Sequence, residues 1–327
     1  MQSSLPPQPR IAGFANVESR CVDHDSARLS SRIEDWRPEQ ASQRQPTAAL
    51  DRALDPARPH WKVCDGLPEI EATDLQANIL RQAIHQHGAL LVRNLLPQNV
   101  LPGLILAIDR VTEACGGASR GHYFSPPDAL RIKMPKGELG RSRAFHRDSG
   151  SIMCAEAPSV AETLLELYAD LGLKALLTDY LGELPCLSVK KWVLRKTLLP
   201  VHQAGWHQDG AFMGADIHSI NVWIPLTRCG GDTGAPGMDM VPARLHNIVS
   251  ADGALFDWSV SPESVTEQFS DTPPVAPVFN PGDALLFDHF FLHRTQYRSD
   301  FQRPRYALET WFFGQSAAPL NQVPIRW

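Results

Sequence analysis

The sequence of 327 residues predicts a mainly β fold with flanking helices, and two observations lead to that prediction. Amphipathic helical patterns dominate residues 68–184, whereas short apolar runs separated by Gly and Pro fill the chain from residue 185 onward. Many short antiparallel strands after a helical half are typical of a double-stranded β-helix, the jelly-roll barrel of the cupin type. We therefore expect a barrel core at 185–314, braced by helices, in a single domain of residues 61–327.

Each element follows from its residue pattern. Residues 1–60 are rich in Ser, Gln, Pro, Arg and Asp and lack periodicity, which indicates an N-terminal arm or a partly disordered leader. Apolar residues recur at three- and four-residue steps in predicted helices at 75–87, 99–115 and 159–181. The predicted strands follow at 186–199, 219–226, 237–241, 275–279, 284–287 and 305–313.

Composition and charge exclude several classes of protein. The formal charge is −5 with both signs interspersed, so no basic stripe suits a nucleic acid. The 6 cysteines form no C-x-x-C pair, which argues against a disulfide framework or structural zinc, and a reducing cytoplasm is the simplest location. No apolar run reaches the roughly 18 residues that span a bilayer. We expect a small-molecule substrate and no nucleic-acid or membrane partner, and the oligomeric state stays open.

The most informative motif is His207-Gln208-Asp209, together with His293, which follows His207 by 86 residues. Residues i and i+2 of an extended chain point to the same side, so a strand-to-loop corner can present an imidazole and a carboxylate together. The third ligand must come from a distant strand. Two imidazoles and one carboxylate are the ligand set of non-haem Fe(II) oxygenases, which leave coordination positions open for O2 and a cosubstrate.

The segments after this motif point the same way. A Pro281-Gly282 turn opens an apolar run that reaches His293, and Arg305 begins a second run with an aromatic end. A guanidinium on that strand could bind a dicarboxylate end-on through a bidentate fork, as 2-oxoglutarate would require.

These motifs resemble the phytanoyl-CoA dioxygenase family of Fe(II)/2-oxoglutarate-dependent oxygenases. The resemblance covers roughly residues 185–314, with a weaker match from Leu80 to Pro97. It depends on the order and spacing of several pieces, which are Trp206 to Gly210, Asn221 to Leu226, Gly237 to His246, Pro281 to His293 and the arginine strand. One piece departs from the family pattern, because Ala243-Arg244 replaces the usual Gly-Ser, so no contact from that loop is carried over.

The resemblance implies three iron ligands, which are His207, Asp209 and His293. It also implies that Arg305 binds 2-oxoglutarate and that Thr295 is the small hydroxyl residue that meets the same cosubstrate.

Arg303 is the alternative to Arg305, because family members usually place this arginine a residue or so closer to the distal histidine. We prefer Arg305, which directly precedes the aliphatic strand.

The implied reaction consumes O2 and 2-oxoglutarate, releases succinate and CO2, and hydroxylates an unactivated C–H bond of a small molecule such as a secondary metabolite. Halogenating relatives carry a small residue in place of Asp209, so this carboxylate favours hydroxylation or a related desaturation or cyclisation. Two other classes stay open. A metal-binding cupin isomerase or hydrolase would not need Arg305 and Thr295, and the intact ligand set argues against a catalytically silent binding barrel.

Other residues near these motifs can be interpreted in two ways. Trp206 either walls the site and contacts the cofactor or is barrel core. Asn221 and Trp223 share a strand face that either lies near the cosubstrate or packs outward. Only one of Arg195 and Lys196 can point into the barrel, and we assign Arg195 to carboxylate binding.

Two further expectations concern charged residues. Glu309 shares a strand face with Arg305, and a buried carboxylate there would need a partner. A second H-x-D motif, His146-Arg147-Asp148, follows a basic glycine-containing stretch, so we expect a solvated or substrate-facing loop outside the metal site.

Overall fold

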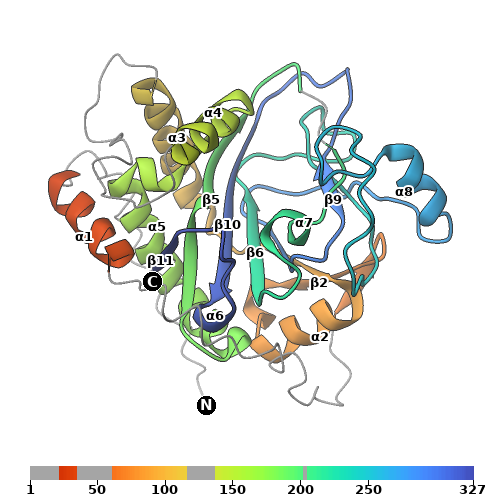
Figure 1. Cartoon of the computed structure of the whole chain (residues 1–327), viewed down its shortest axis with the longest axis horizontal. Coiled ribbons are helices and arrows are strands. Elements are labelled where there is room, and N and C mark those ends of the chain that lie inside the picture. The colour runs from red at the N-terminus through yellow and green to blue at the C-terminus, as the bar shows by residue number, and fades with distance from the viewer. Residues whose placement is uncertain (1–21, 35–60, 116–136, 202–204) are drawn as a thin grey trace.

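A computed structural model describes residues 22–34, 61–115, 137–201 and 205–327 (Figure 1). Its centre is a nine-stranded sheet with the order β1-β2-β3-β8-β6-β10-β5-β11, in which β4 also pairs with β5. The β2–β3 pair is parallel, and the other pairs are antiparallel. The strands are β1 Lys62–Cys64, β2 Leu67–Glu71, β3 Ala89–Arg93, β4 Ser151–Met153, β5 Pro185–Thr197, β6 Ser219–Pro225, β8 Ala284–Phe287, β10 Arg305–Gly314 and β11 Pro324–Arg326.

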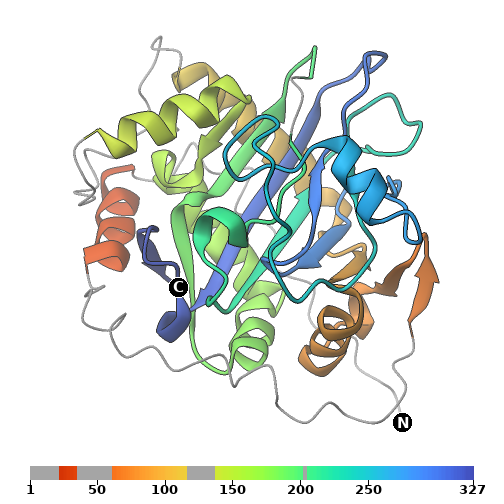
Figure 2. The ribbon, with the colours of Figure 1, turned by 45° about the vertical axis from the view of Figure 1, so that its right-hand side comes forward.

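A second, two-stranded sheet consists of β7 (Met238–Met240) and β9 (His293–Thr295). Both methionines of β7 pack in one hydrophobic cluster with side chains of the large sheet, such as Trp223 and Phe287. The small sheet therefore lies over one face of the large sheet and closes the barrel interior between them (Figures 1 and 2).

Alternation along the strands gives the large sheet two distinct faces. On β10, Ala307 and Trp311 belong to the cluster in the barrel interior. Their neighbours Leu308 and Phe312 belong to a larger cluster that the helices share. One face is thus the wall of the barrel, and the other carries the helical layer.

The helices are α1 Val22–Glu34, α2 Ala77–His87, α3 Leu101–Cys115, α4 Glu138–Asp148, α5 Pro158–Asp170, α6 Leu173–Leu181, α7 Gly210–Met213 and α8 Pro262–Gln268. Helices α1, α2, α3, α5 and α6 pack in the cluster on that outer face, whereas α7 and α8 contribute to other clusters (Figure 1). Short 3-10 turns occupy Ala72–Asp74, Gln98–Val100, Cys154–Glu156 and Gln315–Ala317. Across the described ranges, none of the helices has the length and apolar character needed to cross a membrane.

Three predicted elements differ from the structure. The predicted helix at 159–181 is two helices, because Gly172 adopts φ +76°, a conformation that L-residues avoid. The predicted strand at 275–279 contributes only isolated bridges at Val275 and Phe279, since Pro277 lacks the N–H that a ladder needs. The helical half, 68–184, also contains the strands β3 and β4 and most of β2.

Helix α1 lies within the segment predicted as an arm. Leu29 and Ile33 are buried in the helical cluster, and the Arg32 Nε lies 2.8 Å from Oε1 of the buried Glu162 on α5. The Arg28 Nη2 lies 3.3 Å from the other oxygen of the same carboxylate. Residues 22–34 are therefore part of the packed domain, whereas the rest of the predicted arm lies outside the described residues.

Candidate active site

The three predicted metal ligands meet at one end of the barrel interior. His207 and His293 are paired through their backbones, with His207 N–H donating to His293 O at 2.9 Å and His293 N–H donating back at 3.0 Å. Asp209 directly precedes α7. One potential ligand atom from each of the three side chains lies within 4.8 Å of the others, and no other such group occurs in the described part of the chain.

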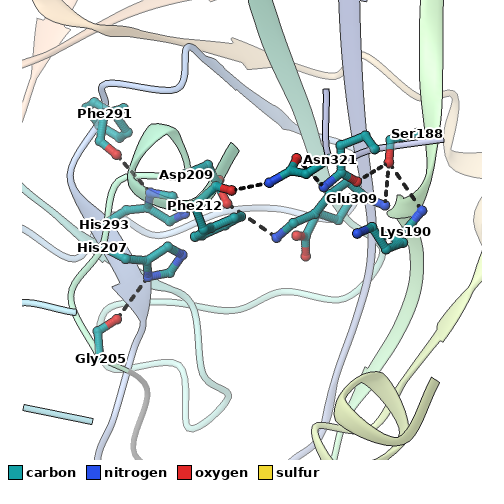
Figure 3. A network of polar contacts seen from close by, with 12 residues as sticks. Ser188, Lys190, Gly205, His207, Asp209, Phe212, Phe291, His293, Glu309 and Asn321 are labelled. Carbon is teal, nitrogen blue, oxygen red and sulfur yellow. Dashed lines mark hydrogen bonds and ion pairs between the residues drawn. The ribbon is translucent and has the colours of Figure 1, made fainter. Parts of the chain in front are cut away.

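Both imidazoles are oriented by backbone carbonyls (Figure 3). The Nδ1 of His207 lies 2.9 Å from Gly205 O, and the Nδ1 of His293 lies 3.0 Å from Phe291 O. A carbonyl can only accept, so each Nδ1 carries the proton and each Nε2 keeps its lone pair. This arrangement fixes the tautomer and ring orientation that metal-binding histidines require.

The electrostatics of the site also suit a metal cation. Burial, and then the neighbouring His293, lowers the pKa of His207 to about 4, so its imidazole is neutral at pH 7. The Nε2 of His293 lies 3.9 Å from Oδ2 of Asp209, a distance that leaves room for an ion between them. The other oxygen, Oδ1, lies 3.4 Å from the Lys191 Nζ.

Gln208 supports the ligand pair from the opposite side. Residues i+1 and i point in opposite directions along an extended segment, so Gln208 turns away from the metal site. Its amide donates to Phe290 O at 2.6 Å and to Asn247 O at 3.0 Å, and its Oε1 accepts from Val249 N–H at 2.7 Å. The sequence analysis did not identify this role, although the position between two ligands implied the direction.

Gly210 follows the ligand pair in a tightly packed position. Its N–H donates to His289 O at 2.9 Å, and an added Cβ would lie 2.8 Å from Ile248 Cδ1 and 3.1 Å from that same carbonyl oxygen. A side chain here would displace the turn that carries Asp209.

Arg305 is buried on the inner face of β10 and has no carboxylate partner among the described residues. Its guanidinium donates to Gly237 O at 2.7 Å, Pro236 O at 3.2 Å and Thr197 Oγ1 at 3.1 Å, while Nε has no hydrogen-bond partner there. Burial, and then the like charge of Arg195, lowers the pKa of Arg305 to about 10, so it stays protonated at pH 7. A buried cation without a counter-ion is suited to an anionic ligand.

Thr295 lies close to the anchor of that arginine. It pairs with Met238 across the small sheet. At the adjacent position of the same strand pair, Gln296 N–H donates to Gly237 O at 3.1 Å. Gly237 O also accepts from Arg305. His293 and Thr295 point to one side of β9, so Thr295 lies between the metal ligand and the Arg305 anchor.

The other arginine candidate occupies a different environment. Arg303 is exposed and hydrogen-bonds to the carbonyl of Thr233. Its exposure makes Arg305 the better candidate for a buried anion site.

Lys191, Arg195 and Glu309 form a cluster of charged side chains near the candidate ligands, which we call the inner charged group. Arg195 lies opposite Ala307 and faces inward, whereas Lys196 pairs with Asp109 of α3 on the outer side at 2.6 Å, as period-two alternation requires. The Arg195 Nη2 donates to Glu309 Oε2 at 2.9 Å.

Glu309 is partly buried, with 17% of its side chain exposed, and its partner is Arg195. Burial raises the pKa of Glu309, but Arg195 and then Lys191 more than reverse this and bring it to about 2. Glu309 is therefore ionised at pH 7.

Asn221 and Trp206 occupy contrasting positions. Asn221 is buried opposite Trp311 on the inner face, and its Oδ1 has no partner among the described residues. Trp206 instead packs in a separate cluster with Val260 and Leu292, 4.8 Å from the guanidinium carbon of Arg294. It precedes a ligand by one residue and so points away from the metal site, which is why its assignment as a cofactor-binding residue is not supported.

The second H-x-D motif lies on a helix, so the loop prediction is wrong. His146 and Asp148 belong to α4, and residues two apart on a helix point in different directions. His146 is buried, whereas Asp148 is exposed. Burial, and then the charges of Lys191 and Arg195, lowers the pKa of His146 to about 4. His146 thus lies near the inner charged group.

Aromatic side chains that the sequence analysis missed surround the ligands. The ring centroid of Trp258 lies 5.3 Å from that of His207 and 5.0 Å from that of Phe212. Phe256 stacks on Trp258 with centroids 4.7 Å apart. These residues lie outside the regular strands and helices or in the short α7, where hydrophobic periodicity gives no signal.

Comparisons with known proteins support the fold. No protein-family model matches the chain, and no curated protein sequence matches it. The crystal structure of EctD from S. alaskensis with 2-oxoglutarate and 5-hydroxyectoine is similar with a TM-score of 0.51 and 17% identity, over 84% of this chain and 87% of that chain. The structure of EctD from S. alaskensis with bound Fe gives 0.50 and 16%, over 73% and 76%. The predicted double-stranded β-helix with flanking helices is confirmed.

Proposed function

We propose that the protein is an Fe(II)- and 2-oxoglutarate-dependent dioxygenase that hydroxylates an unactivated C–H bond of a small molecule. The observation that carries this proposal is the convergence of His207, Asp209 and His293 within 4.8 Å, with both imidazoles oriented by carbonyls. Two nitrogens and one carboxylate oxygen on one side of a metal are typical of non-haem Fe(II) oxygenases. The similar structures with 2-oxoglutarate and with Fe agree with this proposal.

The cosubstrate assignment depends on Arg305. A buried guanidinium that donates only to carbonyls and a hydroxyl, with its Nε free among the described residues, fits a carboxylate of 2-oxoglutarate. Thr295 would offer its hydroxyl to the same carboxylate, and Asn221 has an inward amide without a full set of partners. A cupin isomerase or hydrolase that did not use 2-oxoglutarate would leave the Arg305 charge buried and unpaired.

The side chains of this protein would have distinct tasks in the reaction. When bound, Fe(II) supplies the activation of O2 that couples decarboxylation of 2-oxoglutarate to C–H hydroxylation, with succinate, CO2 and the alcohol as products. His207, Asp209 and His293 would hold the metal on one side. Lys191 orients the Asp209 carboxylate, and Phe212 and Trp258 shield His207 from water.

The finer assignments belong to the same proposal. The order of the motifs favours a relative of phytanoyl-CoA dioxygenase, and residues 61–327 would form the catalytic domain, with α1 packed against it. Five free cysteines in the described part of the chain suit a reducing compartment such as the cytoplasm.

The decisive test is aerobic succinate formation from 2-oxoglutarate with added Fe(II). We expect turnover for the wild-type protein, with some activity even without the true substrate. The variants His207→Ala, Asp209→Ala and His293→Ala should lose it, whereas the exposed His246→Ala serves as a matched histidine control and should retain it. Absence of succinate from Fe(II)-loaded, folded wild type would refute the proposal.

A further inference from the structure

Four aromatic rings, which we call the aromatic row, lead from the protein surface to the metal ligands. They are Phe145 on α4, Phe256 and Trp258 in the loop before α8, and Phe212 on α7. Phe145 and Phe256 meet edge to face with centroids 6.0 Å apart, and Phe256 stacks on Trp258 at 4.7 Å with an interplanar angle of 15°. Trp258 then contacts Phe212 at 5.0 Å and the ligand His207 at 5.3 Å.

The outer half of the row is open to solvent. Phe145 is 49% exposed and Phe256 is 37% exposed, although both are large apolar side chains. The contact joins residues more than a hundred positions apart in the sequence, so it is a feature of the fold and not of local chain geometry. Phe145 and Phe256 adjoin one another and thus form a continuous exposed apolar surface, which is the kind of surface that an apolar ligand can cover.

A cation lies at the inner end of the row. The Lys191 Nζ is 4.2 Å from the Phe212 ring centroid and 3.4 Å from Asp209 Oδ1. The like charge of Lys191 lowers the pKa of His146, which is next to Phe145 of the row, and burial is the larger cause of that shift. The inner end of the row therefore contacts Lys191, and Lys191 in turn contacts the candidate ligand Asp209.

The positive and negative charges of the side chains near the candidate ligands are unequal in number. Of the described side chains at the site, Lys191, Arg195 and Arg305 are cations, whereas Asp209 and Glu309 are anions. Under the proposed function, the two positive charges of Fe(II) cancel the two negative charges of 2-oxoglutarate. One positive charge remains on side chains that are buried or partly buried, and an anionic group of the substrate would neutralise it.

We propose that the aromatic row and Lys191 form the substrate-binding surface, and that the substrate is a planar ring compound with one anionic group. The ring would stack along Phe256 and Trp258, and the anion would pair with the Lys191 ammonium beside the metal ligands. This inference deepens the proposed function and depends on it for the location of the reacting C–H bond. The binding surface itself exists without metal or cosubstrate, so it can be tested separately.

The test uses isothermal titration calorimetry of the full chain with 2-naphthylacetate, which has a planar ring and one carboxylate. Two matched compounds separate the contributions, because 2-naphthylacetamide lacks the charge and cyclohexylacetate lacks the planar ring. We expect 2-naphthylacetate to bind about tenfold more tightly than either. The titrations are done with metal-free protein and with protein loaded with Ni(II), which does not support turnover, and 2-oxoglutarate.

Variants assign the binding to the named residues. Phe256→Ala should weaken binding of 2-naphthylacetate by about two- to tenfold, the range for loss of an aromatic pair, whereas Leu320→Ala, also exposed but outside the row, should leave it unchanged. Lys191→Met should weaken 2-naphthylacetate about tenfold and leave 2-naphthylacetamide within about twofold. Lys191→Arg should restore most of the loss, which separates charge from folding.

Several results would overturn the inference. These are equal binding of the acid and the amide, equal binding of the planar and non-planar acids, no effect of Phe256→Ala, or displacement of 2-naphthylacetate by 2-oxoglutarate. Binding with the expected pattern but without succinate formation would support the surface and refute the oxygenase. Succinate formation without binding would do the reverse.

Discussion

Under the proposed function, Arg305 is the residue that would bind 2-oxoglutarate. Arg305→Ala should lower 2-oxoglutarate affinity by about 2 to 5 kcal/mol, roughly 30-fold or more, because one carboxylate would be desolvated and unpaired. Arg305→Lys should rescue only partly, since an ammonium is a point charge and not a fork. Thr295→Ala should cost about 1 kcal/mol. The measurement is titration of the anaerobic Fe(II) protein with 2-oxoglutarate.

Arg303→Ala is the matched control for that titration, since Arg303 is exposed and hydrogen-bonds to a loop carbonyl. Its affinity for 2-oxoglutarate should equal that of the wild type. If Arg303→Ala binds weakly and Arg305→Ala binds normally, the two roles are reversed.

His146 makes folding stability depend on pH. Burial, with Lys191 and Arg195, lowers its pKa to about 4 in the folded state, against an ordinary value of 6.5 in the unfolded chain. Between these values the unfolded chain binds more protons, so stability is full above about pH 6.5 and falls as the pH drops toward 4. His146→Gln should reduce the loss between pH 7 and pH 5 by about 2 kcal/mol. Urea unfolding of metal-free protein at both pH values measures it, and equal losses for the two proteins would contradict it.

Gly210 is a position where one methyl group should disturb the metal site. In Gly210→Ala the added Cβ would crowd Ile248 and the His289 carbonyl, at a cost of about 1 to 3 kcal/mol. We expect weaker Ni(II) binding as well as lower stability. The control is Gly140→Ala, which has open space around it on α4 and should stabilise by about 0.5 to 1 kcal/mol. Equal metal affinity for Gly210→Ala and wild type would show that the turn has freedom to move.

At the scale of elements, the packing of α1 against α5 includes two ion pairs with the buried Glu162 carboxylate. Removing both partners in Arg28→Ala/Arg32→Ala would leave the charged Glu162 buried and unpaired, at a cost of about 3 to 5 kcal/mol. Adding Glu162→Gln to that double variant should recover much of the loss, because the buried charge is then gone. Urea denaturation of the three proteins gives the comparison. A triple variant as unstable as the double variant would mean that the loss comes from helix packing alone.

The sequence predicted the strands whose side chains alternate regularly between two buried faces. Strands β5, β6, β8 and β10 begin within a residue of their predicted starts, since they alternate between a helical layer and a barrel interior. Helix α4 was missed because its sequence is strongly polar and contains a glycine, so it has no apolar stripe to detect. The break between α5 and α6 at Gly172 comes from the backbone conformation of that glycine, and the apolar periodicity on either side of it gave no sign of a break.

The sequence predicted the candidate metal ligands, but it did not predict the aromatic row or the ion pairs of the site. The motifs and their spacing indicated the three candidate metal ligands, and strand parity required that only one of Arg195 and Lys196 face the barrel interior. The structure shows that this residue is Arg195. The aromatic row was not predictable, because Phe145 and Phe256 meet only after α4 and the loop before α8 have been brought together in three dimensions. Pairings such as Arg195 with Glu309 depend on register between neighbouring strands, which one sequence does not state.

At the scale of the whole molecule, we expect the fold to persist when metal is removed. The ligands are held by backbone pairing and carbonyls of the protein, so chelator-treated protein should keep its far-UV circular dichroism. Adding Ni(II) at a hundredfold excess over Kd should raise the free energy of unfolding by about 2.7 kcal/mol. His293→Ala should abolish that rise, and the exposed His246→Ala should not. Unfolding on chelation would show that the metal is structural.

The mutual backbone pairing of His207 and His293 also has a consequence for the order of events in folding. The two residues are 86 positions apart, and closing so long a loop has an entropic cost that must be met before either ligand reaches the other. Under the proposed function, we therefore expect the three ligands to come together late in folding, so that the unfolded chain has no preformed iron site. Bound metal would slow unfolding of the finished protein and leave the rate of its folding unchanged.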